Sequence, residues 1–503
     1  MGVIARQSIK GAMANYLGVA IGFVVSFFVL TRYLTQEEIG LTRVLVDAAL
    51  LFSSVAQLGT GSSLVRFFPY FKSDGGSGVP HHGVFGLAML VPLIGFSLFA
   101  LAFLLFRDPL IAIYSEHSPL VADYFYLLPM LTFFALYTAV FEAGSSVLLR
   151  ITVPKLVREV GIRLFNLAAY LLYGFGVVSL DGFVWLFCGS FAAAMVLNLC
   201  YLVSLGGFSL RLERHFLNRE MVRDMVRYTL FMTITALAGN IPLISTLFLG
   251  AKVGLALTGV YTIASYVANV VEVPYRSLGA IAQPVIATAV KENRWDEVNR
   301  LARQVSLHQL LASSLIFYLI WINIDTLFAI IPNGADYAAG AGVVLILGVA
   351  KMVNSSLSIG SNILNFSRYY AWSPVFILVL SLAAIGLNDL FIGRLGIEGA
   401  ATAILTAYVV YFTLLLGFLY WRQHVSLFSA AQVKVVVMLV LLMVADMAWK
   451  QWVTPLGMPL LVGAAVKTVV LGGAAAAVTY CWGISPTVNK MVKDVVAARR
   501  KRE

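Results

Sequence analysis

The chain has 503 residues, of which 60% are hydrophobic and only 12% are charged. A soluble globular protein is roughly 45–50% apolar and about 25% charged. These values exclude a soluble enzyme, a disordered chain and a nucleic-acid binder as first interpretations. The net charge of +11 is instead typical of a membrane protein whose basic residues gather in its cytoplasmic loops.

Apolar segments long enough to cross a bilayer recur along the whole chain. A membrane-spanning helix needs about 20 predominantly apolar residues. The fourteen expected spans are, in chain order, 11–31, 40–64, 83–106, 120–146, 161–179, 183–205, 228–250, 254–280, 304–324, 339–363, 373–393, 398–421, 433–450 and 457–482. The sequence therefore predicts an all-α integral membrane protein with about 14 transmembrane helices.

The distribution of basic residues predicts the orientation of these spans. With the N-terminus in the cytoplasm, 27 Lys and Arg residues lie on the inner side and 5 on the outer side. Cytoplasmic loops carry the excess of basic residues in multi-pass proteins. Both termini are therefore expected in the cytoplasm.

Two charged segments on the inner side have helical amphipathic patterns. Residues 291–303 carry Trp295, Val298 and Leu301 at helical spacing, and the basic tail after Pro486 has a valine-rich face. Both are expected to lie as interfacial helices on an anionic inner leaflet. An ordinary solvated helix is an equally open interpretation of the tail.

The first two-thirds of the chain repeat at an offset of about 217 residues. Residues 108–114 match 325–331, and Gly40 matches Gly259. Each repeat holds six spans, an even number, so the two repeats should be parallel and related by a twofold axis along the membrane normal.

This repeat defines the expected domains. Residues 1–210 form an N-lobe of spans 1–6, and residues 211–425 form a C-lobe of spans 7–12. Residues 426–503 form an appendage of two extra spans and the basic tail. Transporters built from such repeats bind their substrate in a central cavity between them, near the midplane.

The first helix of each repeat carries residues that weaken a helix. Gly22 in span 1 lies near the repeat equivalent of Pro242, which follows Asn240 in span 7. Gly22, Asn240 and Pro242 are therefore candidate hinges beside the cavity. Gly18 and Gly22 also form a GxxxG pair, so close helix packing stays open as the alternative.

Charged residues inside the predicted spans are the candidate site residues. A charge at the bilayer centre costs free energy, so such residues usually have a function. Arg43 and Asp47 lie four residues apart on span 2, as do Glu272 and Arg276 on span 8. The other candidates are Glu142 in span 4, and Lys351 and Asn354 in span 10.

These charges admit a structural and a functional interpretation. The two i,i+4 pairs can neutralise one another and fix helix packing. Lys351 has no acidic neighbour in its own span, which favours a functional role. Substrate binding is therefore assigned to Arg43, Arg276, Lys351 and Asn354, and cavity acids or ion coupling to Asp47, Glu142 and Glu272.

Motifs for catalysis or cofactor binding are absent from the sequence, including a phosphate-binding loop and HExxH. The adjacent His81 and His82 are expected to be solvated rather than metal ligands. We expect no enzyme activity, no metal and no cofactor. Uphill transport would then use an ion or substrate gradient, with sodium or protons as the coupling ion.

Two segments resemble the polysaccharide flippases of the multidrug/oligosaccharidyl-lipid/polysaccharide exporter superfamily. They are Arg32-Tyr-Leu-Thr-Gln-Glu-Glu-Ile-Gly40 after span 1 and Gly396-Ile-Glu-Gly-Ala-Ala-Thr-Ala403 before span 12. The resemblance implies a flippase that moves undecaprenyl-diphosphate-linked oligosaccharide outward by alternating access. It also implies that cavity cations, here Arg43 and Lys351, meet the diphosphate or acidic sugars.

The same resemblance implies the setting of the protein. The expected location is the inner membrane of a bacterium, in O-antigen, lipopolysaccharide or related polysaccharide synthesis. The expected partners are the lipid-linked oligosaccharide, membrane lipids and other membrane proteins of polysaccharide assembly, with no nucleic acid.

Two alternatives stay open at this point. A cation-coupled drug exporter of the same superfamily would use Asp47, Glu142 and Glu272 as its main ligands. A membrane-embedded polysaccharide polymerase or ligase would usually carry a large outer loop with catalytic Arg or His. The longest outer loops here have only about a dozen residues, which disfavours that enzyme.

Overall fold

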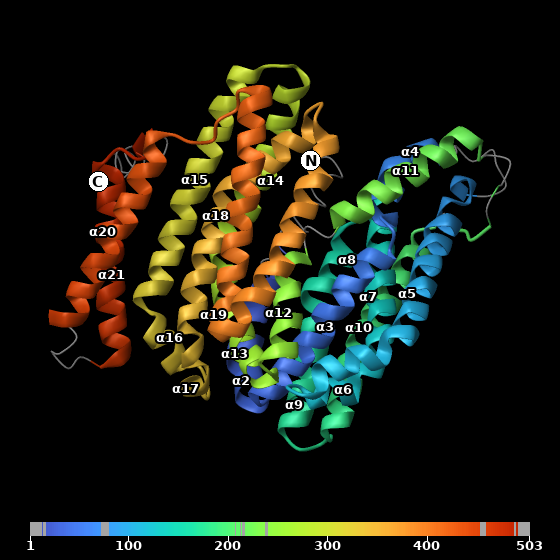
Figure 1. The fold of residues 1–503 in the computed structure, drawn as a ribbon, viewed down its shortest axis with the longest axis horizontal. Helices are drawn as coiled ribbons and strands as arrows, with labels where there is room; N and C mark the ends of the chain where they lie inside the picture. Colours follow the sequence, from blue (N-terminus) through green and yellow to red (C-terminus); the bar gives the residue numbers. More distant parts are fainter. Residues whose placement is uncertain are drawn as a thin grey trace, which may run out of the picture. The chain divides into compact units, whose positions relative to one another are not determined.

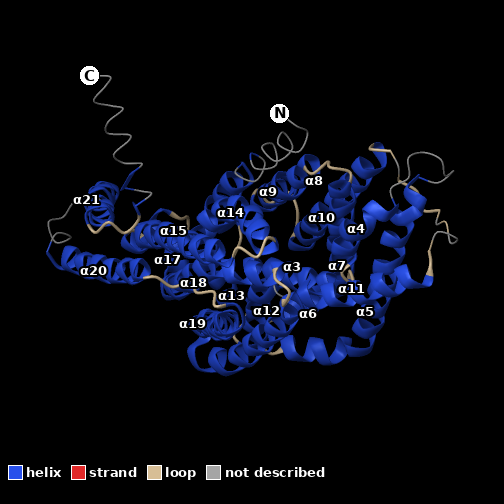
Figure 2. Cartoon of the chain, turned by 90° about the horizontal axis from the view of Figure 1, so that it is seen from above, coloured by secondary structure: helices blue, strands red, loops and turns tan. Residues whose placement is uncertain are grey.

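The computed structural model describes residues 17–71, 80–206, 208–211, 217–236, 240–452 and 459–486, together with Met13, Glu213, Asn489 and Lys490. Throughout this part of the chain the regular structure is helical, and Figure 2 shows no strand in it. Ten of the described helical segments are long and apolar enough to cross a membrane. The expected all-α integral membrane fold is therefore confirmed.

Each predicted span contains a helical segment. The short apolar helix Leu17–Tyr33 corresponds to the first span, and the merged segment Tyr370–Gln423 holds spans 11 and 12. Within that segment Gly396 has φ 57° and ψ −131°, a conformation that only glycine adopts readily, so the helix direction changes there. About 14 transmembrane helices therefore agree with the structure.

The chain divides into two compact units. The first contains residues up to Thr262 together with Ala384–Ala400, and the second contains Ile263–Ala383 and the residues from Ala401 onward. The boundary differs from the expected lobe boundary at residues 210 and 211, because α11, α12 and the start of α13 belong to the first unit. The lobes stay a prediction from the repeat.

The first unit is a helical bundle (Figure 1). Its elements are η1 (Val25–Val29), α2 (Leu30–Tyr33), α3 (Gln36–Ala56), α4 (Thr60–Phe71), η2 (Pro80–Gly83), α5 (Val84–Ser115), α6 (Pro119–Tyr124), η3 (Phe125–Leu127), α7 (Leu128–Val147), α8 (Thr152–Leu156), η4 (Val157–Gly161), α9 (Ile162–Gly174), α10 (Leu180–Ser204), α11 (Arg219–Ala236), α12 (Ile241–Lys252) and the start of α13 (Leu255–Asn269). Helix α7 packs on α3, α4, α5 and α10, so it lies at the centre of this unit.

The second unit is built around α15. Its elements are η7 (Val270–Glu272), α14 (Val273–Lys291), α15 (Trp295–Ile322), α16 (Ile324–Ile330), α17 (Gly334–Tyr337), η8 (Ala338–Gly340), α18 (Ala341–Phe366), η9 (Tyr370–Trp372), most of α19 (Ser373–Gln423), α20 (Ala430–Trp452) and α21 (Leu460–Cys481). Helix α15 packs on α14, α18, α20 and α21.

Part of the motif Arg32–Gly40, which follows the first span, forms the start of helix α3. Thr35 and Glu38 form a capping box at the start of α3, with a Thr35 N to Glu38 Oε2 distance of 2.8 Å. Two backbone donors at the helix start are thereby satisfied. The Tyr173 hydroxyl donates to Glu38 Oε1 at 2.5 Å and ties the start of α3 to α9.

Two glycines matched by the repeat make reciprocal contacts. A Cβ atom on Gly40 of α3 would collide with the carbonyl oxygen of Leu255, and a Cβ on Gly259 of α13 would collide with the carbonyl of Gln36. Leu255 follows Gln36 at the same offset that separates the two glycines. Equivalent residues that exchange contacts in this way are the pattern produced by a twofold axis. The contact supports the predicted repeat.

The helices of the appendage dock through a buried ion pair within the second unit. Lys467 Nζ of α21 lies 2.6 Å from Asp446 Oδ1 of α20 and donates to the carbonyl of Ile322 at 2.7 Å. The indole of Trp321 on α15 donates to the other Asp446 oxygen at 3.1 Å. These bonds satisfy both charges inside the apolar bundle, as burial requires.

The predicted interfacial helix at 291–303 is not a separate element. Helix α14 ends at Lys291, and Trp295 begins α15, which continues without interruption to Ile322. Val298 is 0% exposed, whereas Trp295 and Leu301 are half-buried, so protein covers part of this apolar face. The basic tail after Pro486 lies almost entirely outside the described residues.

Candidate functional site

A polar cavity of about 590 Å³ lies within the first unit. It is lined by Gln57, Gly61, Ser62, Val65, Arg66, Ala139, Glu142, Ala143, Ser146, Ile151, Pro154, Lys155, Arg158 and Tyr228. These residues come from the junction of α3 and α4, from α7, from the segment 151–158 and from α11. We call this space the head cavity. Its volume is within the range of about 300–1,000 Å³ typical of ligand pockets.

A break in the second predicted span forms one wall of the head cavity. Helix α3 ends at Ala56, and Leu58 and Gly59 have positive φ of 51° and 65° before α4 begins at Thr60. The Gly59 position also approaches the carbonyl oxygen of Thr229, which lies 2.6 Å from where a Cβ would stand. Only glycine fits such a turn without strain. The turn places Arg66 of α4 on the cavity wall.

Cations outnumber acids among the residues that line the cavity. Arg66, Lys155 and Arg158 line it, against the single carboxylate of Glu142. The Arg66 guanidinium carbon lies 4.3 Å from the centroid of the Tyr228 ring, a cation–π contact that fixes its position. No ion pair joins Arg66 or Lys155 to another described residue. The head cavity therefore favours an anionic ligand.

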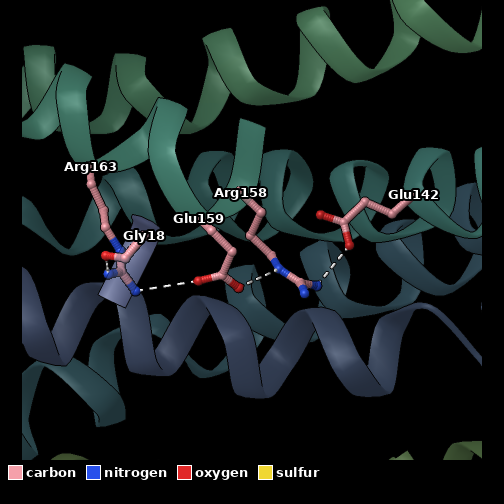
Figure 3. A network of polar contacts seen from close by, with 5 residues as sticks. All are labelled: Gly18, Glu142, Arg158, Glu159 and Arg163. Atoms are coloured by element: carbon pink, nitrogen blue, oxygen red, sulfur yellow. Dashed lines mark hydrogen bonds and ion pairs between the residues drawn. The ribbon is translucent and has the colours of Figure 1, made fainter. Parts of the chain in front are cut away.

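A chain of ion pairs runs from the cavity to the first helix (Figure 3). Arg158 Nη1 lies 2.8 Å from Glu142 Oε2, and Arg158 Nε lies 3.4 Å from Glu159 Oε1. Glu159 also meets Arg163 Nη2 at 3.4 Å, and Arg163 donates to the carbonyl oxygen of Gly18. The network links the wall of the cavity to span 1.

One oxygen of Glu142 has no partner in the part of the chain that the structure describes. Oε1 is buried and receives no hydrogen bond from a described residue, while Oε2 is held by Arg158. A buried carboxylate oxygen without a donor costs free energy. It is thus a position where a ligand hydroxyl or a cation would be stabilised. Glu142 lines the head cavity, and its predicted role as an acid of a central cavity between the repeats stays a prediction.

The predicted pair on span 2 forms as expected. Arg43 Nε lies 2.7 Å from Asp47 Oδ2, and Asp47 is only 1% exposed. The Thr246 hydroxyl of α12 also hydrogen-bonds to Asp47. The pair lies where α3 packs on α12. Arg43 therefore already carries a counter-charge, and neither residue lines the head cavity.

The second group of predicted residues gathers in the second unit. Lys351 Nζ of α18 lies 3.3 Å from Glu272 Oε2, and Asn354 Nδ2 donates to Glu272 Oε1 at 2.9 Å. The partner that Lys351 lacks in its own span thus comes from η7. The Arg276 side chain, expected to pair with Glu272, lies outside the described residues.

The candidate hinges lie at helix irregularities. Gly22 precedes the π-helical turn η1 by three residues, and Asn240 and Pro242 stand where α12 begins. A Cβ on Gly22 would meet the Arg163 guanidinium, so Gly22 lies in close contact with the end of this flexible side chain. Residues 237–239, between α11 and α12, lie outside the described part. The hinge role stays a prediction.

Sequence reasoning missed Arg66, Lys155 and Arg158 as site residues. They lie outside the predicted spans, whereas the candidate site residues are charges inside the spans. A usable signal was the spacing of Lys155 and Arg158, three residues apart and thus on one helical face. His82, expected to be solvated, instead pairs through Nδ1 with Glu213 Oε2 at 2.6 Å.

Metal binding has no support within the described ranges, where no group of three or more His, Cys, Asp or Glu side chains is placed to hold an ion. The three cations that line the head cavity give it the composition of a binding site for an anionic ligand.

Comparison with known proteins decides the family. The sequence profile described as "Polysaccharide biosynthesis protein" matches residues 4–290, more than half of the chain. The chain belongs to this family. A search among curated protein sequences gave no significant match.

Solved structures show the same fold. The lipid II flippase MurJ in an inward closed conformation has a TM-score of 0.71 and 11% identity, over 95% of this chain and 100% of that one. An inward-facing multidrug resistance MATE family transporter has a TM-score of 0.61 and 17% identity, over 84% and 98%. A MOP superfamily transporter from Pyrococcus furiosus has a TM-score of 0.55 and 17% identity, over 84% and 95%. At these identities the matches establish the fold.

Proposed function

We propose that this protein is a flippase that carries an oligosaccharide linked to undecaprenyl diphosphate across the bacterial inner membrane. The family match to polysaccharide biosynthesis and the fold shared with a lipid II flippase support this class of substrate. The matched structures belong to a flippase and to transporters, which supports transport rather than catalysis. The product would serve cell-surface polysaccharide synthesis, such as O-antigen assembly in lipopolysaccharide.

The observation that carries the proposal is the excess of cations in the head cavity. We assign the diphosphate group to Arg66, Lys155 and Arg158, and sugar hydroxyls to the free oxygen of Glu142. A diphosphate accepts several charge-assisted hydrogen bonds, which are stronger than neutral ones. Arg43 and Lys351 remain proposed contacts after movement of the substrate, since each must first leave its acidic partner.

A complementation experiment tests this assignment. The Arg66→Gln and Lys155→Gln variants are expressed in a strain that lacks its own flippase, and surface glycan and membrane protein are both measured. A hydrogen bond to a charged group contributes about 1.5–3 kcal/mol, so each variant should lower the transport rate about tenfold or more.

Arg150→Gln is the matched control, because Arg150 is an exposed cation of the same connection and does not line the cavity. It should support surface glycan at the level of the unmodified protein. Full surface glycan from both Arg66→Gln and Lys155→Gln would refute the assignment.

A cation-coupled exporter of small molecules is the second candidate. The unpartnered Glu142 oxygen favours it, because a carboxylate in a cavity can bind a cation or a proton. In that case Glu142→Gln, made together with Arg158→Gln to keep charge balance, should abolish efflux of a cationic dye from everted vesicles. If the protein is a flippase, neither the unmodified protein nor the double variant should show dye efflux.

A further inference from the structure

A second cavity in the first unit has the opposite chemistry to the head cavity. It is a groove of about 370 Å³ between α4, α5 and α11, and none of the described residues that line it is charged. Its few hydroxyl groups are already bonded within the protein: Ser63 Oγ lies 2.9 Å from Thr229 Oγ1, and Thr60 donates to the carbonyl of Gln57 at 2.6 Å. The described lining of the groove therefore offers hydrocarbon contact, and its hydroxyl groups are already bonded.

The groove and the head cavity share two helices. On α4, Val65 and Arg66 line the head cavity, whereas Leu64 and Phe67 line the groove. On α11, Tyr228 lines the head cavity and the adjacent Thr229 lines the groove. Helices α4 and α11 pack directly on each other (Figure 1). The two spaces share no lining residue, so they lie on different faces of these helices. Because an α-helix is about 10 Å across, a polyprenyl chain is long enough to run around one helix from one space to the other.

The rim of the groove is apolar and accessible. Val222, Val226 and Leu230 line it at intervals of four residues along α11 and are 41%, 52% and 58% exposed. Arg223 and Arg227 are exposed beside this stripe on the same helix. An apolar stripe flanked by arginines is typical of a helix at the membrane interface. A ligand can therefore reach the groove from the lipid phase.

We infer that this groove holds the part of the polyprenyl chain nearest the diphosphate while the head cavity holds the diphosphate itself. The inference rests on the proposed flippase function and adds the position of the lipid tail. An amphiphile whose charged head and hydrocarbon tail are joined matches two spaces on different faces of the same helices, one cationic and one apolar. A free oligosaccharide or a small cation would leave the groove unused.

Binding of two diphosphates to the purified full-length protein tests the inference. Geranylgeranyl diphosphate should bind at least tenfold more tightly than inorganic diphosphate, because only the former fills the groove. Val226→Trp on α11 and Val91→Phe on α5 narrow the groove from two walls and should each remove this preference. Leu98→Trp is the control, since Leu98 is an exposed residue of α5 outside the groove.

Binding of inorganic diphosphate by each variant reports whether the head cavity is still intact. If both groove variants bind inorganic diphosphate normally and keep the full preference for the prenylated ligand, the inference is overturned. Two variants on different helices guard against the misfolding of one of them.

A photolabelling experiment tests the tail site separately from the proposed flippase function. A polyprenol with a diazirine on its tail, and no phosphate, should label peptides from α4 and α11, and Val226→Trp should reduce that labelling several-fold. Labelling without any diphosphate binding would refute the head assignment and keep the tail site. Equal labelling by a diazirine phosphatidylglycerol would show that the groove holds ordinary lipid, and would overturn the inference.

Discussion

Three of the charged residues expected inside the spans, Arg43, Glu142 and Lys351, have an opposite charge beside them. The distances are 2.7 Å for Arg43 with Asp47, 2.8 Å for Arg158 with Glu142 and 3.3 Å for Lys351 with Glu272. Taking a charge out of water is so costly that a close counter-charge is the usual solution. Polar side chains of neighbouring helices contribute as well, as Thr246 does for Asp47.

The contact between Lys351 and Glu272 allows substrate binding to be separated from structural support. Among the described side chains, Lys351→Ala leaves the 8% exposed Glu272 with its bond from Asn354. Breaking one partner of a buried pair costs about 3–5 kcal/mol, so we expect less folded protein in the membrane. The double variant Lys351→Ala/Glu272→Ala removes both charges and should restore the amount of protein.

Surface glycan then decides the role of Lys351. If this lysine contacts the anionic substrate, the double variant should be present in normal amount and still transport poorly. Restored transport in the double variant would mean that the pair only supports the fold. The measurement is surface glycan per amount of membrane protein, determined in parallel for both variants.

The sequence predicted local contacts better than distant ones. The Arg43–Asp47 pair follows from helical spacing, because residues four apart lie on one face. The partners of Glu142 and Lys351 lie 16 and 79 residues away, so no periodicity reveals them. Periodicity also could not reveal the cationic wall of the head cavity, which depends on how α4, α7 and the segment 151–158 pack together.

At the scale of helices, the sequence predicted the spans but not their interruptions. Span 2 is divided between α3 and α4 by the turn at Leu58 and Gly59, and π-helical turns occupy Val25–Val29 and Val157–Gly161. These features depend on close approaches between helices. The hydropathy of a segment does not reveal such interruptions. They nevertheless shape the site. The turn at Leu58 and Gly59 places Arg66 on the cavity wall, and the π-helical turn Val157–Gly161 contains Glu159.

The crossing of α3 and α13 gives a prediction at this scale. A Cβ on Gly40 would meet the backbone carbonyl of Leu255, which cannot turn away as a flexible side chain would. Overpacking typically costs about 1–3 kcal/mol. Gly40→Ala should therefore lower the thermal midpoint of the detergent-solubilised protein by several degrees.

Gly189→Ala is the matched comparison, because Gly189 lies within α10 and its Cβ would meet nothing within 4 Å. Alanine is the better helix former, so this change should be neutral or slightly stabilising. The close crossing of α3 and α13 would be contradicted if both variants had the same midpoint.

At the scale of the whole molecule, the predicted topology puts the head cavity and the groove near the cytoplasmic side, where the proposed substrate would bind first. Both are lined by α4 and α11, which border predicted cytoplasmic connections. The lipid-linked oligosaccharide of the proposed function would start on that side. The location of the site and the direction of transport therefore depend on one orientation of the chain.

That orientation is the last prediction, and it rests on the 27 to 5 division of basic residues between the two sides. Because cytoplasmic loops retain Lys and Arg, a reporter fused after Glu213 and one fused at the C-terminus should both be active in the cytoplasm. A reporter inserted at Asn333, between α16 and α17, should be active outside. A periplasmic signal after Glu213 would place the head cavity at the outer face, so that the same cations would receive a substrate already translocated.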